Sequence, residues 1–196
     1  MKTPLGMDRS PVPTVFLDRD GVLNEDLGYV YRISDLKILP GVIEGLSVLK
    51  KFGYRLVVIT NQSGIARGYF SEEDVRSFHK ELAVQLETRI GMGAPIIDSF
   101  HYCPHHPDAN NAQYAKKCQC RKPGTLLVKN AEEIRPYIPE QSFFIGDKES
   151  DVMCGKACGL KTIQIVGAQY PRSDCADFFA RDLVEAADQI IGLRTS

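Results

Sequence analysis

The segment Thr14-Val15-Phe16-Leu17-Asp18-Arg19-Asp20-Gly21-Val22-Leu23-Asn24 combines a strand-like start with two closely spaced acids. Its first four residues are typical of a strand buried on both faces of a parallel sheet. Asp18 and Asp20 follow where this strand ends, and ligands of open α/β sheets bind beyond the carboxyl ends of the strands. Carboxylates this close repel each other unless a cation or a proton lies between them. Oxygen ligands favour Mg²⁺, although a strand end with an ordinary Asp-Gly turn is the alternative.

Strand-like and helical patterns alternate along the rest of the chain. Further strands are expected at 55–59, 96–102, 142–145, 161–166 and 177–179. Helices are expected at about 40–52, 71–89, 124–135, 149–158 and 181–191, with Ser71 as the cap of the second. This alternation predicts an α/β fold with a doubly wound, Rossmann-like and mostly parallel sheet. We expect a loose leader at 1–13 and one domain at 14–196, with an irregular insertion at about 103–122.

The composition is that of an ordinary globular protein and gives no sign of binding to nucleic acid or membranes. The chain has 196 residues, 43% hydrophobic content and a net charge of -1. This charge argues against general binding to nucleic acid or to a membrane surface, and no apolar run approaches the ~20 residues of a membrane span. Three of the six cysteines lie close to histidines within 103–120, which favours a metal site in a reducing cytoplasm over a disulfide framework.

Polar residues with complementary chemistry follow four of the predicted strands or loops. They are Asp18 with Asp20, Thr60 with Asn61, Arg121 with Lys122, and Asp147 with Asp151. Each pair alone has a structural explanation, such as a turn, a helix cap or a solvated charge. Together, acids for a metal, a hydroxyl donor and a lysine suit a phosphoryl group, whose oxygens need neutralisation while a carboxylate attacks in line.

The chain resembles the haloacid dehalogenase superfamily of aspartate-nucleophile phosphatases. The matching motifs are FLDRDGVLN (16–24), DLGYV (26–30), TNQSGIARG (60–68), CPHHP to CQCRKP (103–123) and GDKESD (146–151). Within this superfamily they are most similar to the bacterial heptose bisphosphate phosphatases. The resemblance implies removal of the C7 phosphate of D-glycero-D-manno-heptose 1,7-bisphosphate, in the synthesis of nucleotide-activated heptose for lipopolysaccharide core. Val22 departs from the threonine of many members, and we expect little effect from it.

The resemblance also implies roles for individual residues. Asp18 is the expected nucleophile that forms an aspartyl phosphate, and Asp20 is the expected proton donor and acceptor. Mg²⁺ is expected on the Asp18 carboxylate, the Asp20 backbone carbonyl and Asp147, while Thr60 and Lys122 hold the transferring phosphoryl group. Substrate contacts are expected at Asp26, Leu27, Gly28, Tyr29, Thr60, Asn61, Gln62, Ser63, Arg121 and Lys122. The planar guanidinium of Arg121 suits a distal phosphate.

The irregular insertion carries a predicted zinc site. Cys103, His105, Cys118 and Cys120 form two close pairs whose atoms suit tetrahedral zinc, the alternative being incidental cysteines in a loop. A site with four protein ligands is structural, and it would fix the adjacent Arg121 and Lys122. His106 could compete with His105, but the resemblance favours His105. Cys154 and Cys158, four apart on one predicted helix, are interpreted as core residues, and Cys175 carries no pattern.

Three other functions remain open at this point. Histidinol-phosphate phosphatases share the nucleophile and a similar zinc loop, although TNQSGIARGYF (60–70) favours the heptose branch. A phospho-accepting receiver domain also combines acids, a threonine and a lysine, but has no need for a proton donor such as Asp20. The third is a zinc-stabilised binding module without catalysis. No segment is long enough for a large cap domain, so short loops must cover a sugar bisphosphate substrate, and a monomer is expected.

Overall fold

The computed structural model describes residues 9–167 and 169–195, in which strands and helices alternate. The strands are Thr14–Leu17 (β1), Arg55–Asn61 (β2), Ser99–Cys103 (β3), Phe143–Gly146 (β4), Lys161–Ile165 (β5) and Phe178–Ala180 (β6). The α-helices are Val42–Lys51 (α1), Glu72–Ile90 (α2), Leu126–Ile134 (α3), Glu149–Ala157 (α4) and Leu183–Thr195 (α5). Two single-turn 3-10 helices are Ile33–Asp35 (η1) and Pro139–Gln141 (η2).

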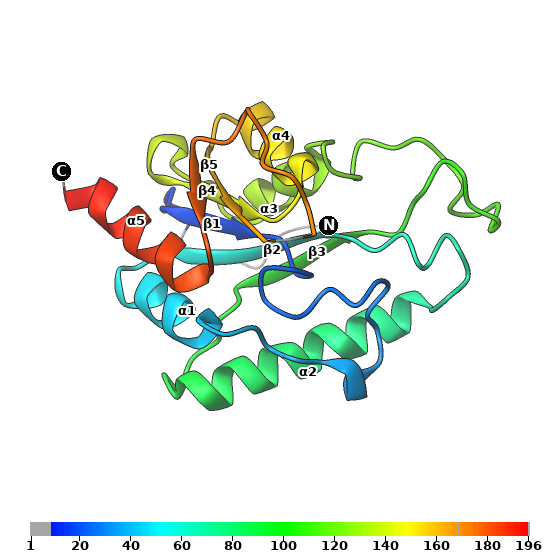
Figure 1. The fold of residues 1–196 in the computed structure, drawn as a ribbon, viewed down its shortest axis with the longest axis horizontal. Coiled ribbons are helices and arrows are strands. Elements are labelled where there is room, and N and C mark those ends of the chain that lie inside the picture. Colours follow the sequence, from blue (N-terminus) through cyan, green and yellow to red (C-terminus); the bar gives the residue numbers. More distant parts are fainter. Residues whose placement is uncertain (1–8, 168, 196) are drawn as a thin grey trace.

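The strands form one parallel sheet in the order β3-β2-β1-β4-β5-β6 (Figure 1). β1 lies between β2 and β4, with Leu17 level with Val58 on one side and Ile145 on the other. Because all neighbouring strands run in the same direction, their carboxyl ends meet at one edge of the sheet. The expected doubly wound parallel sheet is therefore confirmed.

Helices cover both faces of this sheet, with α1, α2 and α5 on one side and α3 and α4 on the other (Figure 1). Side chains of a strand alternate between the two faces, and β1 follows this rule. Val15 and Leu17 join the larger core with Phe78 of α2, whereas Phe16 joins the smaller core with Val128 of α3. β1 is therefore covered on both faces, as its unbroken apolar sequence predicts.

Two elements differ from the expected boundaries by more than two residues. β3 begins at Ser99 and not at position 96, because the preceding Asp98 uses its carboxylate to accept a hydrogen bond from the Leu56 N–H at 2.8 Å. α5 continues past position 191 to position 195. Its last turn is held by Arg194, whose Nη1 donates to the Phe52 carbonyl at 2.7 Å.

The amino-terminal segment is attached to the domain from position 9 onward. Val12 pairs with Tyr137, donating to Pro136 O and accepting from Ile138 N at 3.2 Å each. Arg9 donates to Glu133 O at 2.7 Å. The loose leader expected at 1–13 therefore does not include 9–13, and residues 1–8 lie outside the described residues.

The longest helix, α2, begins as the sequence predicts. Ser71 Oγ accepts from the Asp74 N–H at 3.2 Å, while the Asp74 carboxylate accepts from the Ser71 N–H at 2.7 Å. This reciprocal capping box satisfies donors that the first turn of a helix leaves free. Within the described part of the chain, neither α2 nor another helix has the length and apolar character needed to cross a membrane.

Candidate active site

Three buried acids meet at the carboxyl ends of β1 and β4. Asp18 directly follows β1, and its N–H donates to Ile145 O of β4 at 2.9 Å. Asp147 directly follows β4, and Asp151 lies in the first turn of α4. One carboxylate oxygen from each of the three lies within 4.8 Å of the others. The structure thus brings together the predicted Asp18 and Asp147 and adds Asp151.

The properties of Asp147 are those of a ligand for a cation. Burial, followed by the negative charge of Asp18, raises the pKa of Asp147 to about 8. Its Oδ1 is buried and has no hydrogen-bond partner. A divalent cation would remove the repulsion among these carboxylates and would take this oxygen as a ligand. The all-oxygen donor set therefore fits Mg²⁺.

Gly21 allows Asp147 to approach the turn after β1. Its φ is +83°, a conformation in which residues with a side chain are strained. A Cβ at this position would lie 2.2 Å from Asp147 Oδ2. Glycine is therefore required here both by the backbone and by the space that the carboxylate occupies.

Lys122 lies among the buried acids and carries a positive charge. Its Nζ is 2.8 Å from Asp18 Oδ1, 2.7 Å from Asp151 Oδ1 and 2.7 Å from Ile59 O, so three oxygen atoms surround its ammonium group. Burial by itself lowers the pKa of Lys122, but the carboxylates of Asp151 and Asp18 outweigh it and raise the pKa above its usual value. Lys122 therefore holds one oxygen of Asp18 in a fixed place.

Asn61 connects the end of β2 to the end of the cysteine-rich segment. Its Oδ1 accepts from the Lys122 N–H at 3.0 Å, and its Nδ2 donates to Lys122 O at 3.2 Å. Two hydrogen bonds from one side-chain amide, to the backbone N–H and the backbone C=O of one residue, fix the position and the orientation of that residue's backbone. Asn61, which was predicted as a substrate contact, thus also places Lys122 beside the acids.

Asp20, two residues after Asp18, accepts hydrogen bonds on both of its carboxylate oxygens. Asn24 Nδ2 donates to Oδ1 at 2.9 Å and Gln62 Nε2 donates to Oδ2 at 3.0 Å, while Arg19 Nη2 lies 2.9 Å from each oxygen. Gln62 Nε2 also donates to Thr60 Oγ1 at 2.8 Å. Gln62 therefore connects the predicted proton donor with the predicted phosphoryl-binding hydroxyl of Thr60. Thr60 is 1% exposed and does not line the cavity beside these groups.

A cavity of about 390 Å³ opens above these groups. Its lining includes most of the predicted substrate contacts, namely Asp26, Gly28, Tyr29, Asn61, Gln62, Ser63, Arg121 and Lys122. Leu27 lies outside this lining, and its side chain is exposed beside neighbouring depressions. Arg121 Nη1 is buried without a hydrogen-bond partner, so a donor remains available next to the cavity.

Lys148 and Tyr170 are among the lining residues of this cavity that the sequence analysis did not identify. Lys148 Nζ and the Tyr170 hydroxyl lie 3.0 Å and 3.2 Å from Asp26 Oδ2, and Lys148 Nζ lies 4.7 Å from the centre of the Tyr170 ring. Lys148 stands within GDKESD, a motif that we interpreted only through its acids. Tyr170 lies in a segment without periodicity, so no sequence signal could have identified it.

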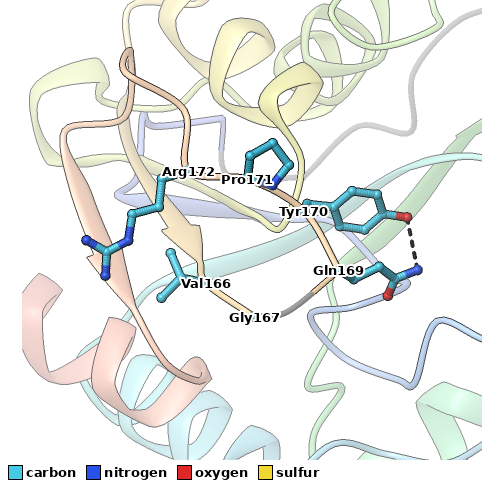
Figure 2. Close-up of a pocket in the computed structure, with 6 residues that line it drawn as sticks. All are labelled: Val166, Gly167, Gln169, Tyr170, Pro171 and Arg172. Atoms are coloured by element: carbon cyan, nitrogen blue, oxygen red, sulfur yellow. Dashed lines mark hydrogen bonds between the residues drawn. The ribbon is translucent and has the colours of Figure 1, made fainter.

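The segment after β5 forms one wall of the site. Figure 2 shows Gln169 and Tyr170 on one side of this segment, joined by a hydrogen bond of 3.2 Å, and Val166 and Arg172 on the other. A depression of about 630 Å³ is lined by residues 166, 167 and 169–172. Asp20, Arg121 and Lys122, which line the neighbouring cavity, do not line it. The chemistry is therefore concentrated in the neighbouring cavity, to which Gln169 and Tyr170 also belong.

The four predicted zinc ligands converge in the segment between β3 and α3. The Sγ atoms of Cys103, Cys118 and Cys120 lie 3.0–3.6 Å apart, and His105 Nδ1 lies 3.2 Å from Cys120 Sγ and 3.7 Å from Cys103 Sγ. Zinc with Zn–S bonds of ~2.3 Å places tetrahedral ligand atoms roughly 3.5–3.8 Å apart, so this donor set fits it. His106 lies outside the cluster, 3.3 Å from Arg67 Nη2.

The other cysteines take no part in this cluster. Cys154 lies buried in the smaller core, where its Sγ donates to Gly124 O at 3.4 Å, and Cys158 packs against the same core. Cys175 is exposed. The placement of Cys154 and Cys158 agrees with the expectation that they are core residues.

The chain is similar to named phosphatases along most of its length. It is 39% identical over 187 residues to the D-glycero-beta-D-manno-heptose-1,7-bisphosphate 7-phosphatase of Photorhabdus laumondii, covering 93% of this chain and 97% of that protein. It is 34% identical to the D-glycero-alpha-D-manno-heptose-1,7-bisphosphate 7-phosphatase of the same organism, with 86% and 90% covered. The sequence profile of HAD-hydrolase-like domains matches residues 119–188.

A solved structure shares the fold. The D,D-heptose 1,7-bisphosphate phosphatase from B. bronchiseptica, crystallised with magnesium and phosphate, superposes with a TM-score of 0.78 and is 25% identical. The match covers 93% of this chain and 99% of that one. The likeness therefore extends over most of this chain and nearly all of that one.

Proposed function

Because the chain belongs to the family of D-glycero-D-manno-heptose-1,7-bisphosphate 7-phosphatases within the HAD-like hydrolases, we propose that it removes the C7 phosphate of that sugar bisphosphate. The observation that carries this proposal is the convergence of Asp18, Asp147 and Lys122 beside one cavity that Arg121 also lines. It supplies a nucleophile, a cation site and positive charge for one phosphate, and a free donor for a second.

Asp18 is the proposed nucleophile. Lys122 Nζ and the Arg19 N–H both contact Oδ1, each at 2.8 Å, so we assign the attack on phosphorus to Oδ2. As the Asp18–phosphorus bond forms, the bond from phosphorus to the sugar oxygen breaks and an aspartyl phosphate remains. Water then attacks the aspartyl phosphate, which releases inorganic phosphate and restores Asp18.

Asp20 is the proposed proton donor and acceptor. It lines the cavity, so its carboxyl group can reach the oxygen that leaves with the sugar. It gives that oxygen a proton in the first step and takes one from the attacking water in the second. Thr60, fixed by its hydrogen bond from Gln62, is proposed to orient the transferring phosphoryl group.

We propose that the protein binds two metal ions, one at the active site and one in the cysteine-rich segment. Asp18, Asp147 and the Asp20 backbone carbonyl would hold Mg²⁺, which neutralises the carboxylates and draws electron density from a phosphate oxygen when bound. Cys103, His105, Cys118 and Cys120 would hold a structural Zn²⁺. The zinc ligand Cys120 directly precedes Arg121 and Lys122, so this ion would keep both cations beside the cavity.

The retained C1 phosphate is proposed to bind Arg121, whose guanidinium suits a phosphate bidentately. Since the beta-named relative from Photorhabdus laumondii is 39% identical and the alpha-named one 34%, we propose the β anomer as the better substrate. The product, heptose 1-phosphate, would then be available for nucleotidyl transfer. We further propose a cytoplasmic monomer, in keeping with six cysteines that form no disulfide.

The test is a steady-state comparison of phosphate release from both heptose bisphosphate anomers, from histidinol phosphate and from 4-nitrophenyl phosphate. We expect the highest kcat/KM for the β anomer and a requirement for Mg²⁺. A higher kcat/KM for histidinol phosphate would contradict the proposed substrate, and a higher value for the α anomer would contradict the proposed anomer. Equal values for all four substrates would show that Arg121 does not select a second phosphate.

A further inference from the structure

Arg19, between the two acids of the DRDGV motif, is completely buried. Its Nη2 lies 2.9 Å from each oxygen of Asp20, and its Nε lies 3.1 Å from Asp20 Oδ1. Its guanidinium carbon lies 4.4 Å from the centre of the Phe78 ring of α2. Removing a guanidinium from water costs several kcal/mol unless its donors are used, so a buried arginine at this position needs partners on every side.

Those partners also fix the plane of the guanidinium. Nη2 donates to Val30 O at 2.7 Å and lies 3.2 Å from Gln62 Oε1. Nη1, on the opposite side from these contacts, lies 3.3 Å from Nε2 of His79, which α2 contributes. The Arg19 guanidinium is therefore held by contacts from three elements: the loop after β1, the end of β2 and α2. Asp20 accepts hydrogen bonds from a donor that cannot rotate.

His79 meets Arg19 as a neutral acceptor. It is 6% exposed, and its ring stacks on Phe100 with the centroids 4.8 Å apart. Burial, followed by the charge of Arg19, lowers the pKa of His79 to about 3. Because arginine can only donate, Nε2 must carry no proton, and the proton of the neutral ring is on Nδ1. His79 does not touch the cavity, so any effect on the reaction must pass through Arg19.

We propose that Arg19 and His79 are positioning residues that hold the Asp20 carboxyl group in the orientation needed for proton transfer to the leaving oxygen. This inference rests on the proposed function. When the phosphorus–oxygen bond breaks, its electron pair stays on the sugar oxygen, which takes the proton from Asp20. A sugar alkoxide is a poor leaving group and needs this proton at once, whereas nitrophenolate is stable as an anion and does not.

Because the two leaving groups differ in their need for a proton, comparing the two substrates distinguishes a displaced Asp20 from a general loss of folded protein. His79→Leu removes the acceptor for Arg19 Nη1, while His79→Gln keeps an oxygen that can replace Nε2. For the sugar bisphosphate we expect His79→Leu to lower kcat/KM about 10- to 100-fold, the loss typical of a catalytic group displaced by ~1 Å. For 4-nitrophenyl phosphate the loss in kcat/KM is expected to be at least about 10-fold smaller, because kcat/KM reports only the steps up to formation of the aspartyl phosphate. Hydrolysis of the aspartyl phosphate, in which Asp20 acts on water, is common to both substrates and affects kcat alone. His79→Gln should recover most of the sugar bisphosphate activity.

Two further variants complete the test. Arg19→Lys keeps the charge but loses the planar guanidinium, so its activity on the sugar bisphosphate should also fall more than its activity on 4-nitrophenyl phosphate. If His79→Leu does not fold, Arg19→Lys tests the proposal in its place. Combining His79→Leu with Asp20→Asn should reduce kcat no further than Asp20→Asn alone. Leu82→Ala, which truncates a buried residue on the same helix, is the control that lowers stability without changing the ratio between the two substrates.

Equal losses on both substrates, or no recovery in His79→Gln, would overturn the proposal. An additive loss in the double variant would do the same. These outcomes are distinct from a failure of the proposed function, which would appear as absent heptose bisphosphate turnover in the unmodified protein. The proposal is supported only if wild type hydrolyses the sugar bisphosphate and the loss depends on the leaving group.

Discussion

Lys122 Nζ lies 2.8 Å from Asp18 Oδ1, although two strands, β2 and β3, and two α-helices, α1 and α2, lie between the two residues in sequence. The same ammonium lies 2.7 Å from Asp151 Oδ1, and no part of it faces bulk water, since its side chain is 1% exposed. Lysine at this position therefore pairs with two buried carboxylates at once. It links the cysteine-rich segment to the acid after β1 and to the acid in α4.

Lys122→Met should lower both stability and activity. It leaves Asp18 and Asp151 buried without their cation, and loss of one partner from a buried ion pair typically costs about 3–5 kcal/mol. Urea unfolding measures this change, and steady-state kinetics should show kcat reduced at least about 100-fold. Lys80→Met, at an exposed position of α2, is the matched control. A Lys122→Met protein as stable as this control would contradict the bridging role.

Asp18→Asn should abolish turnover while the fold is retained. An amide cannot attack phosphorus as a carboxylate does, and loss of a nucleophile commonly lowers kcat by at least about 10⁴-fold. Acid-quenched wild type should carry a phosphoryl group detectable by mass spectrometry, and the variant should carry none. Asp188→Asn, at an exposed position of α5, controls for the change of charge. More than trace phosphatase activity in Asp18→Asn would defeat the nucleophile assignment.

The sequence predicted the elements of this fold well because their local patterns agree with their burial. The alternation of Val15, Phe16 and Leu17 between two cores, for example, follows directly from an apolar strand in a covered sheet. The segment between β3 and α3 could be predicted only through its metal ligands. Its path depends on contacts such as that of Asn61 with Lys122, between residues 61 positions apart.

The sequence predicts site residues whose type and spacing both indicate their chemistry. It does not predict residues whose role depends only on tertiary packing. Asp18 and Asp147 are acids that directly follow strands, and Lys122 comes two residues after the predicted zinc ligand Cys120, so their convergence could be expected. Arg19 has the sequence context of an ordinary exposed charge, and nothing in the sequence indicates that it is buried. His79 follows the helical spacing of core residues in α2, but its partner comes from the turn after β1, which sequence alone cannot reveal.

Cys118→Ser should release zinc and weaken substrate binding. Freshly purified wild type is expected to hold about one zinc per chain, and the variant much less, because a hydroxyl is a poor zinc ligand. Arg121 and Lys122 would then lose their fixed positions, so KM should rise about 10-fold or more and the free energy of unfolding should fall. Metal analysis, kinetics and urea unfolding are the measurements.

Cys175→Ser is the control for this variant, since Cys175 is exposed and lies outside the cluster. It should keep both its zinc and the wild-type KM. Wild-type protein without zinc, purified in the absence of chelators, would contradict the predicted site. Unchanged KM in zinc-free Cys118→Ser protein would show instead that the metal does not position the two cations.

His79 should make the protein less stable in acid. Its pKa falls from about 6.5 in the unfolded chain to about 3 in the folded protein, where burial is the main cause. The unfolded state therefore binds more protons between these values, and stability present above pH 6.5 is lost as the pH falls. Between pH 7 and pH 5 this group should remove about 2 kcal/mol from the free energy of unfolding.

The measurement is urea unfolding of wild type and His79→Gln at both pH values. Glutamine does not titrate, so wild type should lose about 2 kcal/mol more than the variant between pH 7 and pH 5. Acid effects on the carboxylates and cysteines are common to both proteins and cancel in this difference. Identical pH dependence in the two proteins would show that His79 takes up its proton as readily when folded as when unfolded.

Gly21→Ala should weaken Mg²⁺ activation selectively. The new Cβ would lie 2.2 Å from Asp147 Oδ2, so the carboxylate must move, and the concentration of Mg²⁺ for half-maximal activity should rise at least about 10-fold. Gly53→Ala is a matched control, because Gly53 has nearly the same φ, +81°, but nothing within 4 Å of its Cβ position. Both variants should lose about 1–2 kcal/mol through backbone strain. Only Gly21→Ala should change the metal requirement; an equal requirement in the two variants would place the cation away from Asp147.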